Sequence, residues 1–167
     1  MSDREAILVS VPGRLEFREV AVRAVAAASR LVGGRQNVDR PADQAPFDLS
    51  NTFDAELVSA FSEVFNNVVM HSYQLRSGRV DIEIAADDTG ITLQLTDRGT
   101  PFDISQVPSP ELDSMPDHGL GIHIAKSFVD ELSYEPGPPN VWRLTKYARP
   151  SNRDHGTGAV HGPDNDM

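Results

Sequence analysis

Three polar side chains recur four residues apart in one strongly apolar segment: Glu63, Asn67 and His71. Segment 54–73 has the apolar periodicity of an amphipathic helix, so residues four apart stack on one face. A carboxylate can take a proton from an attacking hydroxyl, and an amide oxygen one turn away is a suitable Mg²⁺ ligand. The spacing alone fits a solvated polar stripe equally well. However, two poor helix formers side by side, Asn66 and Asn67, indicate that these side chains are needed.

A second group of candidate residues follows a predicted hairpin. Segments 80–86 and 91–95 alternate apolar and polar residues on either side of the turn sequence at 87–90. Asp97 stands at the end of the second strand, where a carboxylate can accept a hydrogen bond from the exocyclic amine of adenine. Gly99 would let a flat base approach the backbone. Taken alone, this segment also fits a plain turn.

A third motif, Gly119-Leu120-Gly121, precedes a helical pattern and follows a proline-containing segment, 103–118, which is predicted to be a loop and a candidate lid. Glycines at a helix start allow backbone amides to wrap around phosphates. A lone Gly-x-Gly is usually a simple loop-to-helix junction, and neither the Gly-Lys-Ser/Thr loop nor the dinucleotide fingerprint is present. Each motif is weak by itself, but the three in this order are specific.

The remaining periodicities predict the elements that position these motifs. In chain order they are a strand at 6–11, a helix at 15–32, a connector at 35–50, the central helix, the hairpin, a helix with Ile122, Ala125, Phe128, Val129 and Leu132 on its core side, and a last strand at 141–147. This order predicts an α/β sandwich with helices on one face of the sheet. Residues 1–148 form the predicted domain, and the polar residues 149–167 a disordered tail. His155 and His161 in that tail have no carboxylates nearby to support a metal site.

Composition excludes several classes of function. The 167 residues are 39% hydrophobic, which suffices for one domain with a core. The formal net charge of -10 disfavours direct nucleic-acid binding. There is no cysteine, and no apolar run approaches the roughly 20 residues of a membrane span. The N-terminal residues lack a signal-type apolar core, so we expect a cytoplasmic protein without membrane contact.

Together the motifs resemble the three ATP-binding boxes of the superfamily that contains gyrase, heat-shock chaperones, histidine kinases and mismatch-repair ATPases. Within it, the chain is similar to the anti-sigma factor serine/threonine kinases. The segments that carry this second resemblance are Val11-Pro12-Gly13-Arg14-Leu15-Glu16-Phe17, the Ser62-to-Tyr73 pattern and Leu144-Thr145-Lys146. The resemblance covers roughly residues 6–147.

This resemblance implies a two-layer α/β sandwich of the Bergerat type, with a mixed sheet and helices on one face, that holds ATP or ADP and Mg²⁺. It implies that Glu63 is the catalytic base, Asn67 the Mg²⁺ ligand and Asp97 the adenine contact. The other implied nucleotide-binding residues are His71, Gly99, Gly119, Leu120 and Gly121. The implied partners are an anti-sigma-factor antagonist with a serine or threonine acceptor, a sigma factor, and a second copy of the chain.

Two departures from the resemblance leave an alternative open. Pro138-Pro139-Asn140 stands where relatives often have a glycine followed by threonine, and His118 stands where many have glycine. The alternative is a non-catalytic, nucleotide-responsive module that regulates a partner by docking. The presence of both Glu63 and Asn67 argues against it. A third interpretation, His71 as a phosphoacceptor, is disfavoured because no separate helical domain is present.

Overall fold

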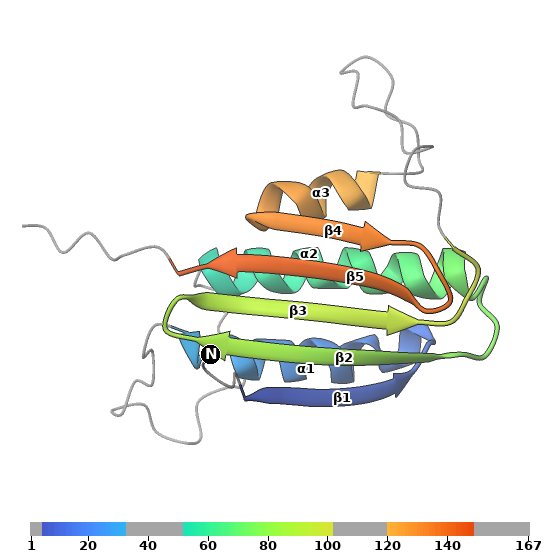
Figure 1. Ribbon diagram of the computed structural model, residues 1–167, viewed down its shortest axis with the longest axis horizontal. Coiled ribbons are helices and arrows are strands. Elements are labelled where there is room, and N and C mark those ends of the chain that lie inside the picture. Colours follow the sequence, from blue (N-terminus) through green and yellow to red (C-terminus); the bar gives the residue numbers. More distant parts are fainter. Residues whose placement is uncertain (1–4, 33–51, 102–119, 149–167) are drawn as a thin grey trace, which may run out of the picture.

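The computed structural model describes residues 5–32, 52–101 and 120–148, which form one sheet with helices packed on one face (Figure 1). The strands are β1 (Ala6–Pro12), β2 (Arg79–Asp87), β3 (Gly90–Asp97), β4 (Glu131–Glu135) and β5 (Asn140–Tyr147). The helices are α1 (Arg18–Ser29), α2 (Thr52–Asn67) and α3 (Leu120–Phe128). A 3-10 helix, η1 (Leu15–Phe17), precedes α1, and a π-helix, η3 (Val68–Ser72), follows α2. The predicted connector at 35–50, the loop at 103–118 and the tail at 149–167 lie outside the described residues.

The predicted two-layer α/β sandwich is confirmed, but the sheet is antiparallel throughout its five described strands and not mixed. The strand order is β1-β2-β3-β5-β4, and each neighbouring pair is antiparallel. The reason is the path of the chain after α3. Strand β4 takes the second position beyond β3, and β5 then returns between them after a short turn. Strands β3 and β4 point the same way, but β5 lies between them, so no two neighbouring strands are parallel.

Strand β4 was not predicted, because the third helix was expected to continue to Leu132. The helix α3 ends at Phe128, and Leu132 instead lies in β4 opposite Leu144. The Asp130 N–H donates to the Thr145 carbonyl at 2.9 Å, which places the chain on the sheet directly after the helix. Leu132 follows Phe128 by four residues, so its position fits the helical period as well as a strand.

The central helix α2 packs its predicted apolar stripe fully against the sheet. The stripe residues are Leu57, Phe61, Val64 and Phe65 of α2 and Val68 at the start of η3, each with 0% exposure. The sheet contributes the inward residues of β2, β3 and β5, including Val80, Ile82, Ile84, Leu93, Leu95, Trp142 and Leu144. Burial of each large apolar side chain contributes about 1.5–3 kcal/mol. The polar face of α2 is thereby held in a fixed position relative to the strands.

A buried cation connects three elements. The Lys146 Nζ on β5 donates to Glu56 Oε2 on α2 and to the Phe128 carbonyl at the end of α3, both at 2.6 Å. A positive charge is favourable at the C-terminus of a helix, where the last carbonyls lack partners. Lys146 therefore ties the end of α3 to α2 and the sheet.

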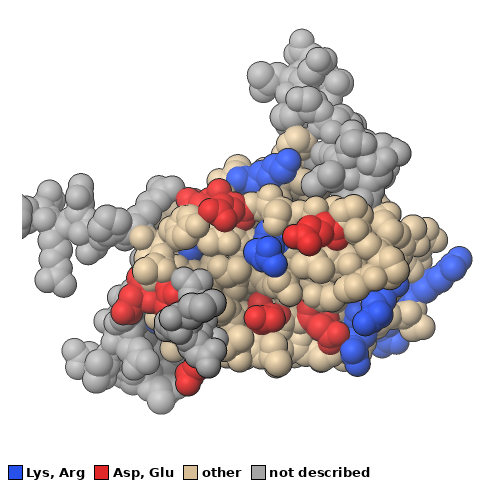
Figure 2. All heavy atoms as spheres, in the orientation of Figure 1, with Lys and Arg blue, Asp and Glu red and all other residues tan. Residues whose placement is uncertain are grey.

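The face of the sheet turned away from the helices carries acidic and basic side chains interspersed (Figure 2). On this face Arg143 donates to Gln94 on the neighbouring strand at 2.8 Å and lies 3.9 Å from Glu135. This polar face agrees with the alternation predicted for the hairpin. None of the described helices is long and apolar enough to cross a membrane.

Candidate functional site

Glu63 and Asn67 lie one turn apart on α2, as the sequence predicts, and both are half-buried. The Asn67 Nδ2 donates to the Glu63 carbonyl at 3.0 Å. This bond uses the nitrogen end of the amide, and within residues 5–32, 52–101 and 120–148 the Asn67 Oδ1 has no hydrogen-bond partner. An amide oxygen presented in this way can serve as a ligand for a hard cation.

The neighbouring Asn66 has a different role. Its Oδ1 accepts a hydrogen bond from Arg18 Nη1 at 3.0 Å, which joins α1 to α2. Of the two asparagines that are unfavourable in mid-helix, Asn66 is therefore explained by packing between helices. The bond that Asn67 makes lies within α2 itself, so only Asn67 remains available for chemistry.

The start of α3 lies directly against Glu63. A Cβ atom placed on Gly121 would overlap Glu63 Oε2, so a residue with a side chain could not stand there without a shift. The positive end of a helix dipole is a favourable place for a carboxylate. Of the predicted Gly119-Leu120-Gly121 motif, the structure brings Gly121 to Glu63 and places Leu120 as an exposed first residue of α3. Gly119 and His118 lie outside the described residues.

The helix that carries Glu63 and Asn67 was predicted to continue to Tyr73, but it is a regular α-helix only to Asn67. Residues Val68–Ser72 form a π-helix, in which the Tyr73 N–H donates to the Val68 carbonyl at 3.0 Å. The wider turn rotates the exposed His71 relative to its position in a regular α-helix. Single π-turns are frequent at functional sites. A contact between His71 and a nucleotide stays a prediction.

Asp97, the strand-end carboxylate, is 1% exposed and only half satisfied. Its Oδ1 accepts hydrogen bonds from the Gly99 N–H and from Asn140 Nδ2, both at 2.8 Å. Its Oδ2 is buried without a hydrogen-bond partner in the part of the chain that the structure describes. A buried acceptor without a donor requires an explanation, and the exocyclic amine of adenine would supply the missing donor.

Burial also shifts the pKa of Asp97. It raises the pKa of the carboxyl above its ordinary value, because desolvation disfavours the ionised form. Hydrogen bonds from Asn140 and Gly99, and the nearby Ser72 hydroxyl, oppose this rise only in part. A hydrogen-bond donor that reaches Oδ2 would stabilise the ionised form further.

Asn140 is the site residue that the sequence interpretation missed. It is 0% exposed, donates to Asp97 Oδ1 and to the Gly99 carbonyl (3.1 Å), and accepts from the Gly137 N–H (3.0 Å). The sequence showed it only as a departure from the family pattern. The available signal was its place in β5, where the alternation with Trp142 points it inward. A polar residue at an inward position is buried and needs partners.

Gly99 is glycine for a reason that the sequence did not suggest. A Cβ atom there would overlap the backbone of Ser72, and the next residue, Thr100, donates its N–H to the Ser72 carbonyl at 2.8 Å. The loop after β3 is thus pressed against the end of the π-helix. A hollow of about 570 Å³ opens beside this contact, lined by residues of the 72–77 loop, residues 98–101, Gly137 and Pro138.

Residues 14–146 match the family of histidine kinase-like ATPase domains. The chain belongs to this family. It is 27% identical over 111 residues to the serine-protein kinase RsbW of Bacillus velezensis, which covers 61% of this chain and 69% of the relative. RsbW of Bacillus subtilis matches with the same identity and coverage. The anti-sigma F factor of Caldanaerobacter subterraneus subsp. tengcongensis is 29% identical over 99 residues, 56% of this chain and 69% of the relative. As a member of this ATPase family, the chain binds ATP.

Proposed function

We propose that this protein is an ATP-dependent serine/threonine protein kinase that acts as an anti-sigma factor. The relatives named above support this function, and the family match supports the ATPase domain. The observation that carries the proposal is the pairing of Glu63 and Asn67 on one helix with a buried, half-satisfied Asp97. A docking module without catalysis would have no need of the Glu63 carboxylate as a base. The ATPase domain spans residues 1–148 and is followed by a polar tail.

Asp97 is the proposed adenine contact. Its Oδ2 lacks a donor, while Oδ1 is held by Gly99 and Asn140, so the carboxylate is already oriented before a ligand arrives. A buried acceptor that is fixed in this way discriminates strongly, because a base without the amine leaves it unpaired. The proposed substrate is therefore ATP in preference to nucleotides with a carbonyl at the same ring position.

The phosphate end is assigned to the polar face of α2 and the start of α3. Asn67 Oδ1 would hold Mg²⁺, and the ion, when bound, neutralises charge on the phosphates. Glu63 would accept the proton of the serine or threonine hydroxyl, which is the role of a general base in phosphoryl transfer. Gly119, Leu120 and Gly121 would supply backbone amides to the phosphates.

The proposed phosphoacceptor is a serine or threonine of an anti-sigma-factor antagonist, and the second partner is a sigma factor bound by a homodimer of this chain. The protein would act in the cytoplasm. The net charge of -10 makes direct contact with nucleic acid unfavourable, so control of transcription would proceed through these protein partners.

The test is transfer of labelled γ-phosphate from ATP to a purified antagonist protein from the same genome. We expect Glu63→Gln to reduce the transfer rate by about 10²- to 10⁴-fold, the usual contribution of a general base, with unchanged affinity for ATP. Glu83→Gln, on the exposed face of the sheet, is the matched control and should transfer at the wild-type rate. A normal rate in Glu63→Gln would refute the base assignment. Binding of ATP without any transfer by the wild type would favour the docking module.

A further inference from the structure

The Tyr73 side chain lies where three segments of the site meet. Tyr73 directly follows the π-helix, and its ring fills the space between Gly13, after β1, and Gly78, before β2. A Cβ atom on either glycine would overlap the ring. Both glycines are therefore explained by the need to accommodate this aromatic side chain, which is half-buried and fixed in direction.

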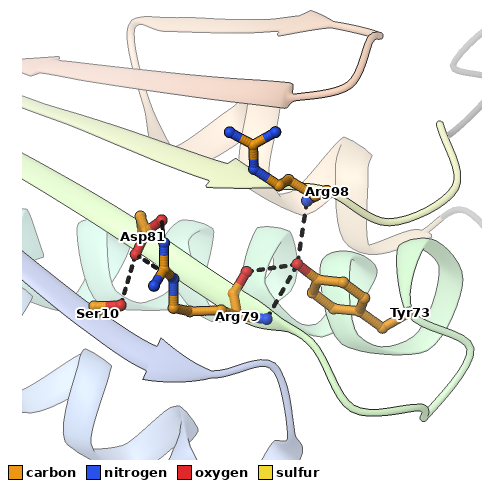
Figure 3. A network of polar contacts seen from close by, with 5 residues as sticks. All are labelled: Ser10, Tyr73, Arg79, Asp81 and Arg98. Carbon is orange, nitrogen blue, oxygen red and sulfur yellow. Dashed lines mark hydrogen bonds and ion pairs between the residues drawn. The ribbon is translucent and has the colours of Figure 1, made fainter.

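The Tyr73 hydroxyl uses its whole hydrogen-bonding capacity on backbone groups (Figure 3). It donates to the Arg79 carbonyl at 2.5 Å and accepts from the N–H groups of Arg79 (3.2 Å) and Arg98 (3.1 Å). A phenolic hydroxyl has one donor and two acceptor positions, so all three are occupied. The bonds join the end of the α2–η3 helix to the start of β2 and to the residue after Asp97.

Arg79 belongs to a paired strand. Arg79 pairs with Pro12 of β1 in the sheet, and its guanidinium lies 3.1 Å from Asp81 Oδ1 (Figure 3). Asp81 in turn accepts a hydrogen bond from the Ser10 hydroxyl at 2.6 Å. The hydroxyl of Tyr73 is thus bonded on one side to a paired strand and on the other to the loop that follows Asp97.

Three consecutive backbone N–H groups in the loop after β3 each donate a hydrogen bond. The Arg98 N–H donates to the Tyr73 hydroxyl, the Gly99 N–H to Asp97 Oδ1, and the Thr100 N–H to the Ser72 carbonyl. Two of these three acceptors belong to the dipeptide Ser72-Tyr73. Ser72 follows Asn67 by only five positions, so these hydrogen bonds fix the loop relative to the helix that carries the proposed Mg²⁺ ligand.

We propose that Tyr73 is a positioning residue for adenine selection: its hydroxyl holds the Asp97–Thr100 loop so that Asp97 Oδ2 meets the exocyclic amine while Asn67 holds the metal end of the same nucleotide. This inference rests on the proposed adenine contact of Asp97. In this role Tyr73 acts through the loop and not by direct contact with the nucleotide. Loss of the hydroxyl would release the Arg98 N–H and let the loop move relative to α2.

The experiment compares the Kd of ATP with that of inosine triphosphate, which carries a carbonyl in place of the exocyclic amine, for wild type and Tyr73→Phe. We expect the variant to bind ATP about tenfold more weakly, as the loss of one or two well-placed hydrogen bonds implies, with little change for inosine triphosphate. A merely structural role would weaken both nucleotides equally. Tyr147→Phe is the matched control, because its hydroxyl bonds Glu131 at the other end of β5.

Two outcomes overturn the proposal, and they separate it from the proposed function. An unchanged ATP-to-inosine-triphosphate ratio in Tyr73→Phe would refute the role of Tyr73 alone. A wild type that binds both nucleotides equally would refute the adenine contact of Asp97 and, with it, the role of Tyr73. Amide hydrogen exchange of Arg98 in the wild type provides a check that does not depend on a folded variant. We expect slow exchange, and exchange at the unprotected rate would show that the bond to Tyr73 is not formed.

Discussion

Asp97 and Asn140 are 1% and 0% exposed and lie in a closed set of hydrogen bonds, whereas Glu63 and Asn67 are half-buried and share a single bond along α2. Around Asp97, Asn140 alone donates twice and accepts once, and Tyr73 and Ser72 fix the next residues. Near Glu63, the described contact from another element is the start of α3, at Gly121.

We propose that this difference corresponds to two tasks. Recognition of a base requires an acceptor whose direction is fixed in advance, and the closed hydrogen-bond set provides that. Transfer of a phosphoryl group requires residues that admit a metal, a nucleotide and a protein hydroxyl, and then release them. On this proposal, the protein combines a buried, hydrogen-bonded end that recognises the base with a more exposed end for the chemistry.

The substitution Asp97→Asn tests the recognition end most severely. The new amide can keep the two bonds to Oδ1, but it places an NH₂ group where the acceptor stood, facing the amine of adenine. We expect the affinity for ATP, measured by titration calorimetry, to fall about 100-fold. Asp81→Asn, which removes the same charge on the open face of the sheet, should bind ATP as the wild type does. Equal affinities in both variants would contradict the adenine contact.

The same substitution should not destabilise the protein without ligand, and pH provides the check. Because folding raises the pKa of Asp97, the native state binds this proton more tightly than the unfolded chain does. The contribution of Asp97 to stability is therefore fully present below about pH 3.9 and is lost as the pH rises through the raised pKa. At neutral pH, Asp97→Asn should be at least as stable as the wild type in denaturant titrations. A relative gain for Asp97→Asn on acidification would contradict the raised pKa.

Asn140→Ala tests the comparison by removing the hydrogen bonds that Asn140 makes around Asp97. It leaves the Gly99 carbonyl and the Gly137 N–H without their partner inside the protein. We expect the free energy of unfolding to fall by about 2–4 kcal/mol. Asn66→Ala, which loses one exposed bond to Arg18, should cost about 1 kcal/mol or less. Similar losses in both variants would show that the Asp97 end is no more constrained than the surface of α2.

Local patterns were sufficient to predict most elements of the fold. The apolar stripe of α2 and the alternation of β2 and β3 are clear signals in the sequence, because each of these elements faces one continuous core. Strand β4 was missed because only Leu132 and Tyr134 alternate, and Leu132 also continues the period of α3. The antiparallel order depends on which strand β5 joins, and no local periodicity contains that information.

The residues of the candidate site likewise fall into those that the sequence could predict and those that it could not. Glu63, Asn67, Asp97 and Gly99 could be proposed because their chemistry is tied to short spacings in the sequence. Asn140 and Tyr73 could not, because the partners that connect them to the site, Asp97 and Arg98, lie 43 and 25 residues away along the chain. The π-helix is likewise invisible in the sequence, since the segment 68–72 has ordinary helical residues and its form becomes evident only with its contacts to the Gly99 loop.

The most direct test of the central claim is the thermal midpoint with and without Mg²⁺ and ATP, for wild type and Asn67→Ala. At about 100 Kd of ligand, binding should stabilise the wild type by roughly 2.7 kcal/mol, a shift of about 5–10 °C. The account predicts that this shift depends on Mg²⁺ and disappears in Asn67→Ala. Equal, Mg²⁺-dependent shifts in both proteins would contradict the assignment of Asn67, and no shift in the wild type at millimolar ATP would contradict the nucleotide site itself.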